Sequence, residues 1–570
     1  MTEAAHHEEE VLGKAYDARL ARRLLRYVRP YRGSLIAGTS LILLGSFFQL
    51  LGPAITAAAL DFAIAPKPGS RNSALARVVS ALALRFHLNL AGAAGLDLFA
   101  GLFLLSLFLS FFLIYAQVWI VNWMGQRIMF DLRAEIFEKL QRADVAYLDR
   151  NPVGRLMTRL TTDVDALNEL FTSGIVSMVG DVFSLAGIVV ALFLLNAPLA
   201  WVTFLTIPLI VGLTAWFRKR ARETYRDIRV RIARINAFLQ EHITGMAVVQ
   251  LFNREERARR DFGRINDAHR TAYLRAIFYY AVFYPGVEFL SALGLALIVW
   301  FGGSEVIRSA LSIGVLVAFI QYAQRFFRPI ADLSDKYNTL QSAMASSERI
   351  FRLLDREPEI VSPRGAVTPG RAGSLALENV SFAYKRGEEV LKNVSFAVEP
   401  GERVALVGHT GAGKTTIASL FLRFYDVQKG AVLVDGTDVR AFGLDDLRGR
   451  FAIVLQDPFL FTSTISDNIR LGNRSISDER IRAAARDARA AGFIEKLPAG
   501  YETVLQERGG GLSAGQKQLI SIARAFAFDP EFLILDEATA NIDTETELEI
   551  REGLSRLLKS RTSLVIAHRL

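Results

Sequence analysis

Long uncharged stretches of hydrophobic residues dominate the first half of the chain. A membrane-spanning helix needs about 20 predominantly apolar residues. Residues 35–60 and 98–126 contain no charged side chain and satisfy this requirement. Residues 277–304 form a similar stretch with one acid, Glu288, and residues 310–324 form a shorter one. Each of these four segments predicts a membrane span.

A further uncharged stretch, residues 182–217, is too long for a single span. The sequence "NAP" at 196–198 interrupts it, and a turn there divides it into two helices. The first of these helices starts near Phe171 and includes Asp181. The hydrophobic pattern therefore predicts six membrane spans in total.

Basic residues set the expected orientation of these spans, because cytoplasmic connections are enriched in Lys and Arg. Residues 218–275 contain fifteen Lys or Arg and residues 127–170 contain seven, whereas the turn at 196–198 contains none. Both long basic connections and both termini are therefore expected in the cytoplasm. Their acids and bases alternate at helical spacing, which is typical of solvated helices that extend beyond the bilayer.

The second half of the chain has a different pattern. A stretch rich in Pro and Gly at 355–374 reads as a linker. After it, short apolar runs such as "RVALVG" alternate with helix-like segments such as "KTTIASLFLRF", as in a soluble α/β domain.

Composition narrows the class of protein. With 570 residues the chain needs at least two domains, and with no cysteine it forms neither disulfides nor thiolate sites. The net charge of +9 is explained by arginines beside the apolar spans rather than by nucleic-acid binding. The first 33 residues are polar and show no removable signal peptide, so the first span is expected to act as signal and anchor.

A glycine-rich loop between a predicted strand and a predicted helix is the first candidate binding site. Gly408, Gly413, Lys414 and Thr415 fit the spacing G-x-x-x-x-G-K-[ST]. In such a loop the backbone N–H groups surround phosphate oxygens, the lysine reaches the β- and γ-phosphates, and the hydroxyl binds Mg²⁺.

A second acidic motif completes a nucleotide site. The predicted strand at 532–535 ends in Asp536, which is placed to hold Mg²⁺. Glu537 follows, and a carboxylate there can act as general base on the attacking water. ATP and Mg²⁺ are therefore the expected ligands.

Between these motifs, "LSAGQ" at 512–516 resembles LSGGQ, the signature of ABC transporters, with Ala514 at the first glycine. On this resemblance the chain is identified as a half-size exporter of the type IV fold. The resemblance implies a multidomain membrane protein, with a six-helix transmembrane domain followed by an α/β P-loop ATPase domain of ABC type. The expected domains are an N-terminal segment with an elbow helix (1–33), the transmembrane domain (34–330), a connecting helix and linker (331–374) and the nucleotide-binding domain (375–570).

The resemblance also implies roles for individual residues. Tyr384 stacks on adenine, Gln456 senses Mg²⁺ and water, His568 contacts the γ-phosphate, Asp543 communicates across the dimer, and Glu507 is an exporter-type loop element. The expected ATP-binding loop comprises Gly408, His409, Thr410, Gly411, Ala412, Gly413, Lys414, Thr415 and Thr416. Leu512, Ser513, Ala514, Gly515 and Gln516 act on the ATP of a partner subunit, and Thr415, Gln456 and Asp536 hold Mg²⁺.

The same resemblance implies an obligate dimer in the plasma (inner) membrane, with coupling regions at 147–167 and 235–255. It also implies that the nucleotide domain continues past Leu570, since relatives add a strand and a helix. ATP drives the export or flipping of an amphiphilic or hydrophobic substrate by alternating access. A multidrug, lipid or peptide substrate, an ATP-gated channel or regulatory subunit, and a heterodimer with a related chain are alternatives.

Two acids inside predicted spans, Asp181 and Glu288, are candidates for the substrate pathway. Facing a cavity, they would suit cationic amphiphiles. Equally, each acid would fit an interfacial position or a pair with an arginine.

Overall fold

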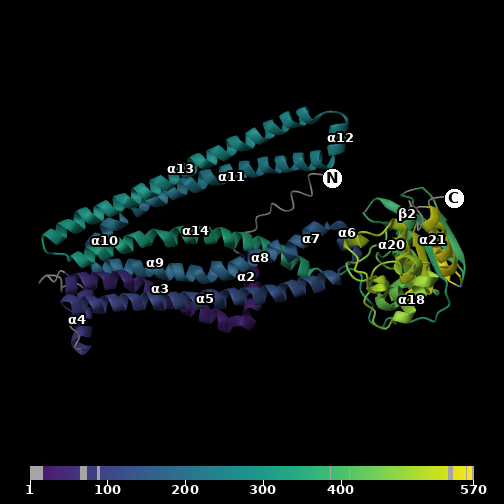
Figure 1. The fold of residues 1–570 in the computed structure, drawn as a ribbon, viewed down its shortest axis with the longest axis horizontal. Coiled ribbons are helices and arrows are strands. Elements are labelled where there is room, and N and C mark those ends of the chain that lie inside the picture. Colours follow the sequence, from purple (N-terminus) through teal and green to yellow (C-terminus); the bar gives the residue numbers. More distant parts are fainter. Residues whose placement is uncertain are drawn as a thin grey trace. The chain divides into compact units, whose positions relative to one another are not determined.

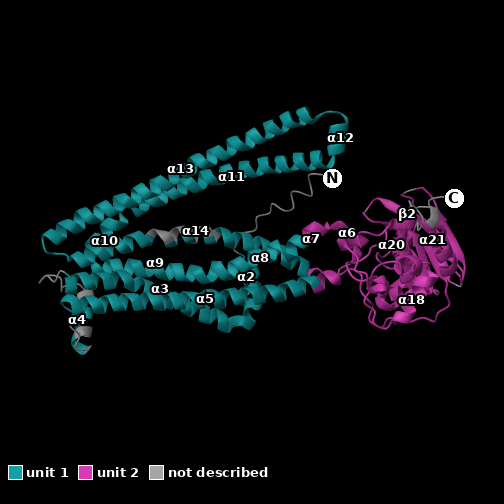
Figure 2. Cartoon of the chain, in the orientation of Figure 1, with its two compact units in different colours: residues 1–137, 157–354 teal, residues 138–156, 355–570 magenta. Residues whose placement is uncertain are grey.

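The structure is a computed structural model, and its chain forms two compact units. It describes residues 17–64, 74–86, 90–385, 387–409, 411–536, 544–559 and 561–567. One unit comprises residues 1–137 and 157–354, and the other comprises residues 138–156 and 355–570 (Figure 2).

The first unit is built from long helices, which Figure 1 shows running side by side. Within the described residues, five helical segments are long and apolar enough to cross a membrane. The sixth predicted span corresponds to a shorter apolar segment, Ile313–Phe326, at the start of a long helix. The helices are α2 (Ala18–Val28), η1 (Arg29–Tyr31), α3 (Arg32–Ala58), η2 (Ala59–Ile64), α4 (Ala74–Phe86), α5 (Gly92–Gln141), α7 (Val153–Leu160), α8 (Thr162–Glu169), η4 (Leu170–Ile175), α9 (Val176–Leu195), α10 (Ala197–Phe204), α11 (Ile207–Thr244), α12 (Met246–Leu251), α13 (Glu255–Ile307) and α14 (Ile313–Asp355).

The turn predicted at "NAP" lies between α9 and α10. Asn196 adopts an extended conformation, and its side-chain carbonyl accepts a hydrogen bond from Leu199 N at 2.9 Å, which caps α10. Its amide donates to Glu305 Oε2 at 3.0 Å, so the turn is also tied to the end of α13. An asparagine at the N-cap and a proline two residues later suit this position. The asparagine side chain bonds a backbone N–H that has no partner within the helix, and the proline ring fixes a backbone angle that the first turn of a helix requires.

Small residues let the helices of this unit approach closely. A Cβ on Gly187 of α9 would lie 2.3 Å from Leu50 Cδ1 of α3, so a larger residue there would displace the Leu50 side chain. At the end of the first span, Asp61 Oδ1 accepts a hydrogen bond from Gly314 N at 2.9 Å and so caps α14. Around these contacts lies a core formed by α3, α9, α10, α13 and α14.

Helices α11 and α13 lie side by side along their length, and the short helix α12 joins their ends (Figure 1). Arginines and acids pair along their outer faces, as Arg231 does with Asp227 at 2.9 Å. This is the alternating charge pattern that the sequence shows, and it keeps these long extensions solvated.

The second unit contains two sheets. An antiparallel sheet has the order β2-β1-β4-β5, and a parallel sheet has the order β3-β8-β7-β6. Apolar residues from both sheets and from the helix after β3 form one core, and residues around α20 form another. The strands are β1 (Leu375–Ala383), β2 (Glu389–Val398), β3 (Arg403–Val407), β4 (Lys429–Val434), β5 (Thr437–Asp438), β6 (Phe451–Val454), β7 (Phe532–Asp536) and β8 (Thr562–Ala567). The helices are α6 (Val145–Arg150), α15 (Lys414–Phe421), η5 (Val439–Ala441), α16 (Leu444–Gly449), α17 (Ile465–Arg470), α18 (Asp478–Asp487), α19 (Ala491–Ile494), η6 (Gly500–Glu502), η7 (Glu507–Gly509), α20 (Ala514–Phe528) and α21 (Thr544–Leu557).

One segment belongs to a different body from the one its sequence position suggests. Residues 138–156, which include α6, pack with the second unit although they lie between two membrane helices in the chain. Asp144 is buried there and accepts hydrogen bonds from Glu359 N at 3.0 Å and from Arg356 Nη2 at 3.5 Å. The guanidinium of Arg356 also lies 4.2 Å from the ring centre of Tyr147.

Candidate nucleotide site

The candidate site lies at one edge of the parallel sheet. Strands β3, β8, β7 and β6 are all parallel, so their carboxyl ends meet at the same edge. The glycine-rich loop follows β3, Asp536 ends β7, and Gln456 follows β6 by two residues. The fold therefore gathers residues that are more than a hundred positions apart in the chain.

The glycine-rich loop has the conformation that its sequence predicts. Gly413 is the N-cap of α15 with φ +86°, a region that favours glycine, and a Cβ there would lie 2.6 Å from Leu391 Cδ2. Lys414 is only 7% exposed. Its Nζ donates to Gly408 O at 2.6 Å and to His409 O at 3.0 Å, so the loop wraps around the ammonium group. Gly411 and Ala412 form the exposed side of this loop.

The residues at this edge fit a magnesium nucleotide. Thr415 Oγ1 donates to Asp536 Oδ2 at 3.3 Å, which places a hydroxyl and a carboxylate together beside the lysine. No group of three or more His, Cys, Asp or Glu that could hold a metal alone occurs among the described residues. The Thr415 hydroxyl and the Asp536 carboxylate suit Mg²⁺, which is usually held by one or two protein oxygens together with substrate phosphates.

Tyr384, the candidate adenine-stacking residue, is fixed to the loop helix. It lies just after β1, and its hydroxyl donates to Thr416 Oγ1 of α15 at 3.0 Å. A second aromatic residue, Tyr425, packs edge-on against it with ring centres 5.0 Å apart. Part of Tyr384 is available to a ligand, since the residue is 39% exposed.

Tyr425 is a functional candidate that the sequence did not indicate, and its partner Asp149 lies in the coupling region predicted at 147–167. The Tyr425 hydroxyl donates to the Asp149 carboxylate, and Arg150 Nη2 donates to Tyr384 O at 3.5 Å. Burial and the hydrogen bond to Asp149 raise the pKa of Tyr425 above its usual range. Because 276 positions separate the two residues, no local pattern in the sequence announces this pair.

The signature segment starts α20 in the expected way. Ser513 is its N-cap: its hydroxyl accepts from Gln516 N at 3.2 Å, and Gln516 Oε1 accepts from Ser513 N at 3.0 Å. This capping box exposes Ser513 and Ala514, while Gly515 is buried and Leu512 is half-buried. Gln518, one turn further, donates to Leu455 O at 3.1 Å and so joins α20 to the segment before Gln456.

Several candidate residues remain predictions. Thr410, Glu537, Asp543 and His568 lie outside the described residues. Gln456 and Glu507 are exposed at the surface of the second unit.

The two acidic candidates of the membrane spans differ in environment. Asp181 of α9 forms an ion pair with Lys336 of α14, and both side chains are largely buried. Asp181 thus has a lysine as its partner, where the sequence offered an arginine pair as one alternative. Glu288 is exposed on α13.

A lysine enclosed by the glycine-rich loop after β3 and a carboxylate at the end of β7 define a P-loop nucleotide-binding domain, here in one chain with long apolar helices. The family model for the ABC transporter transmembrane region matches residues 35–330, and the model for the ABC transporter domain matches residues 391–540. The chain therefore belongs to the ABC transporter family. It has the exporter-type architecture of a half-transporter, with a helical transmembrane domain followed by an ATP-binding domain.

Similar proteins span nearly the whole chain. The ABC transporter ATP-binding protein YknV of Bacillus subtilis is 37% identical over 99% of this chain and 90% of its own length. The fatty acid ABC transporter ATP-binding/permease protein of Mycobacterium bovis is 35% identical, covering 96% and 90% respectively. The ATP-dependent lipid A-core flippase of Syntrophus aciditrophicus is 36% identical, covering 80% and 76%.

Proposed function

We propose that this chain, as a dimer, exports or flips an amphiphilic substrate across the membrane by alternating access, with ATP binding and hydrolysis as the energy source. The observation that carries the proposal is the packing of α6 in the same body as the nucleotide site. Through Tyr425 and Asp149, the segment that follows membrane helix α5 is hydrogen-bonded to the aromatic residue beside Tyr384. A conformational change at the nucleotide can therefore be transmitted to the membrane helices through few contacts.

In this proposal the described residues bind and orient ATP. Lys414 exchanges its bonds to Gly408 O and His409 O for phosphate oxygens, because a charged acceptor makes the stronger hydrogen bond. Thr415, Asp536 and Gln456 hold Mg²⁺, which offsets phosphate charge when bound. Tyr384 stacks on the adenine ring, and Thr416 keeps it oriented.

In this proposal, ATP hydrolysis and communication between the two nucleotide sites depend on the residues to which the family resemblance assigns these roles. Glu537 deprotonates the attacking water, and His568 contacts the γ-phosphate. Leu512–Gln516 acts on the nucleotide of the partner subunit, with Asp543 between the two sites. ATP can drive closure only if the closed dimer binds it more tightly than the open one.

Exposed apolar residues support the dimer. Leu251 of α12 is 74% exposed, and Val248 and Phe252 beside it are also exposed. In the second unit, Leu455, Phe459 and Phe461 are exposed near Gln456. Clustered apolar side chains of this kind mark interaction surfaces. We propose that α12 of one chain docks on the partner's nucleotide domain at these residues.

The names of similar proteins favour a lipid-like amphiphile as the substrate, since these relatives include a fatty acid transporter and a lipid A-core flippase. We place the protein in the plasma (inner) membrane, and the basic residues in 127–170 and 218–275 favour an orientation with both termini cytoplasmic.

ATPase activity of the chain in lipid nanodiscs, beside its Glu537→Gln variant, tests the proposal. We expect turnover by the wild type that the variant loses while it still binds ATP. Undiminished turnover in the variant would remove Glu537 from the role of base. If both chains bind ATP and neither hydrolyses it, a homodimer is excluded and a related partner chain is required.

A further inference from the structure

A cavity of about 530 Å³ lies within the first unit, between α2, η4, α9 and α14. We infer that it binds a single-chain amphiphile with an acidic head group, and that Lys336 contacts this head group. The inference rests on the proposed export function and deepens it by naming the substrate class.

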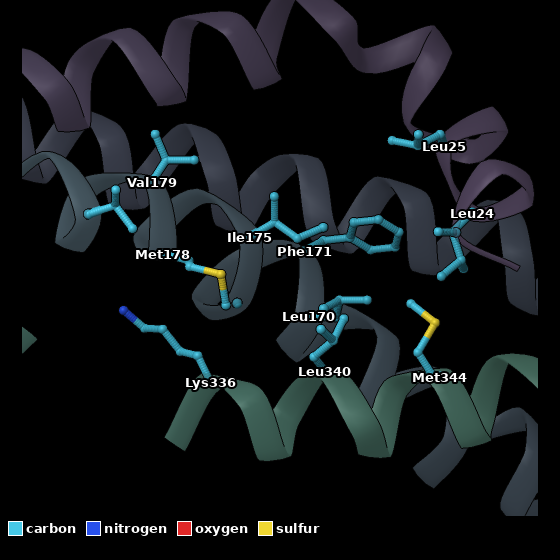
Figure 3. Close-up of a pocket in the computed structure, with 13 residues that line it drawn as sticks. Leu24, Leu25, Leu170, Phe171, Ile175, Met178, Val179, Lys336, Leu340 and Met344 are labelled. Atoms are coloured by element: carbon cyan, nitrogen blue, oxygen red, sulfur yellow. The ribbon is translucent and has the colours of Figure 1, made fainter. Parts of the chain in front are cut away.

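The walls of the cavity are almost entirely apolar. Figure 3 shows Leu24 and Leu25 of α2, Phe171 of η4, Met178 of α9, and Leu340 and Met344 of α14 around it. Its volume is in the range of about 300–1,000 Å³ that is usual for small-molecule sites. Flexible methionine and leucine side chains adapt to chains of different shape. An apolar tail is therefore the part of a ligand that fits most of this space.

Lys336 is the charged residue among those that line the cavity. Lys336, Leu340 and Met344 follow each other at intervals of four, so they lie on one face of α14. Figure 3 shows Lys336 at one end of the cavity, with Leu24 and Met344 at the other. The cavity thus offers one cationic contact at the end of a long apolar surface.

The partner of Lys336 explains why a cation persists among apolar side chains. Asp181 accepts a hydrogen bond from the ammonium group, and its own side chain does not line the cavity. An ammonium has three N–H donors, and this carboxylate does not occupy them all. Asp181 lies in a predicted membrane span, where charged residues are costly and commonly mark substrate pathways. The group presented to a ligand is positive, which favours an acidic head group over a cationic one.

The dimensions favour one acyl chain. The wall from Leu170 to Val182 extends over about 18 Å at about 1.5 Å per residue, close to the roughly 15 Å thickness of one leaflet's hydrocarbon. The rim is open, since Leu25 is 56% and Val182 is 53% exposed. A chain lying in the bilayer can therefore enter from the side without passing through water.

The charge of helix α2 is a second, independent argument that the head group of the ligand is negatively charged. The helix contains four arginines (Arg19, Arg22, Arg23 and Arg26) and no acidic residue, while Leu24 and Leu25 on the same helix face the cavity. Basic amphipathic helices of this kind lie at the membrane surface and attract anionic amphiphiles.

Binding of palmitate to the full-length dimer in nanodiscs of neutral lipid, without nucleotide, tests the inference. A palmitate analogue with a photoreactive group on its tail is cross-linked, and palmitate, methyl palmitate and hexadecyltrimethylammonium compete with it. We expect labelling of peptides that contain residues 170–182 and 336–344, and competition by palmitate far better than by the ester or the cation.

Lys336→Met should weaken palmitate binding by about tenfold or more, the effect of losing a hydrogen bond to a charged group, and leave methyl palmitate unchanged. Lys219→Met, at an exposed lysine of α11, is the matched control and should change neither. Asp181→Asn should keep or strengthen palmitate binding, because the ammonium stays. Should Lys336→Met misfold with Asp181 unpaired, the double variant Asp181→Asn/Lys336→Met removes the pair together and should show the same loss.

Equal competition by palmitate and its methyl ester, or unchanged affinity in the folded Lys336 variants, would overturn the inference. Because binding is measured without nucleotide, its outcome is separate from the ATPase test. Selective palmitate binding by a chain that hydrolyses no ATP would leave the site standing, and export would then require a related partner chain. An active ATPase without head-group selectivity would remove only this substrate class.

Discussion

The hydroxyl of Tyr425 donates a hydrogen bond to the carboxylate of Asp149, a residue of the short helix α6. Tyr425 also packs edge-on against Tyr384, whose hydroxyl donates to Thr416 in the helix that follows the phosphate loop. Contacts among Asp149, Tyr425 and Tyr384 therefore run from the segment between two membrane helices to the proposed adenine-stacking residue, Tyr384.

Tyr425→Phe should separate nucleotide binding from coupling. The ring and its packing on Tyr384 stay, so ATP affinity should change little. The bond to Asp149 is lost at a cost of about 1 kcal/mol, because the exposed carboxylate can bind water instead. We expect substrate to stimulate ATPase activity less in this variant, measured beside equilibrium ATP binding. Tyr384→Phe, which loses the bond to Thr416 instead, is the control. A fall in ATP affinity as large as the fall in stimulation would contradict the coupling role.

Gly413 and Gly411 offer a paired test of the phosphate loop. Both have positive φ, +86° and +85°, so alanine at either position costs about 1–2 kcal/mol in backbone strain. Only at Gly413 would the new Cβ also meet another side chain, at 2.6 Å from Leu391 Cδ2. We expect Gly413→Ala to lower ATP affinity clearly more than Gly411→Ala, measured by titration with a fluorescent ATP analogue. Equal losses would show that backbone strain, rather than packing on β2, sets the loop geometry.

Asp435 should be a major stabilising residue of the second unit. It accepts from Gly373 N at 2.7 Å and from Arg450 Nη1 at 3.1 Å, and both charged side chains are 2% exposed. Asp435→Ala would remove the nearest carboxylate from the buried Arg450 guanidinium and leave only the more distant Asp446 and Glu531, at 3.7 and 3.8 Å, so the cost should approach the roughly 3–5 kcal/mol of a broken buried pair.

To test Asp435, the thermal unfolding of the second unit is measured in the full chain, with protease resistance as the readout. Asp438→Ala removes the partly exposed pair with Arg440 and should cost at most about 1 kcal/mol. Similar losses in the two variants would mean that the buried pair contributes no more than the surface one.

Glu531 predicts a pH dependence of stability. Burial and the nearby Asp435 raise the pKa of its carboxyl, although Arg450 opposes the shift. The folded state thus holds this proton more tightly than the unfolded state, so stability falls as the pH rises through the interval above 4.5, the ordinary value. Glu531→Gln should therefore melt at a higher temperature than the wild type at neutral pH and at the same temperature near about pH 4. A difference that stays constant across this range would exclude titration of Glu531 as the cause.

Local patterns in the sequence were enough to predict the local structure on which the candidate nucleotide site is built. The loop from Gly408 to Thr415 and the strand ending in Asp536 each depend on short-range order, and a parallel sheet brings such strand ends together. The turn at Asn196 is likewise local, because a cap and a proline define it within three residues.

Pairs between distant segments were beyond such reasoning. Lys336 lies 155 positions from Asp181, in a polar stretch after the last predicted span, so nothing near Asp181 indicates its partner. The link between Asp149 and Tyr425 depends equally on how α6 folds against the second unit. Charge and spacing identify which residues are unusual, but only packing decides what they contact.

The chain passes between its two units three times, after Phe137, after Leu156 and after Leu354. A cut in the linker alone would therefore not release an intact ATPase body, since residues 138–156 would stay with the membrane part. An isolated fragment starting at Asp355 would expose the surfaces that Asp144, Tyr147 and Asp149 cover. Three covalent tethers, rather than one, also mean that a displacement of either unit must bend the polypeptide at several points simultaneously.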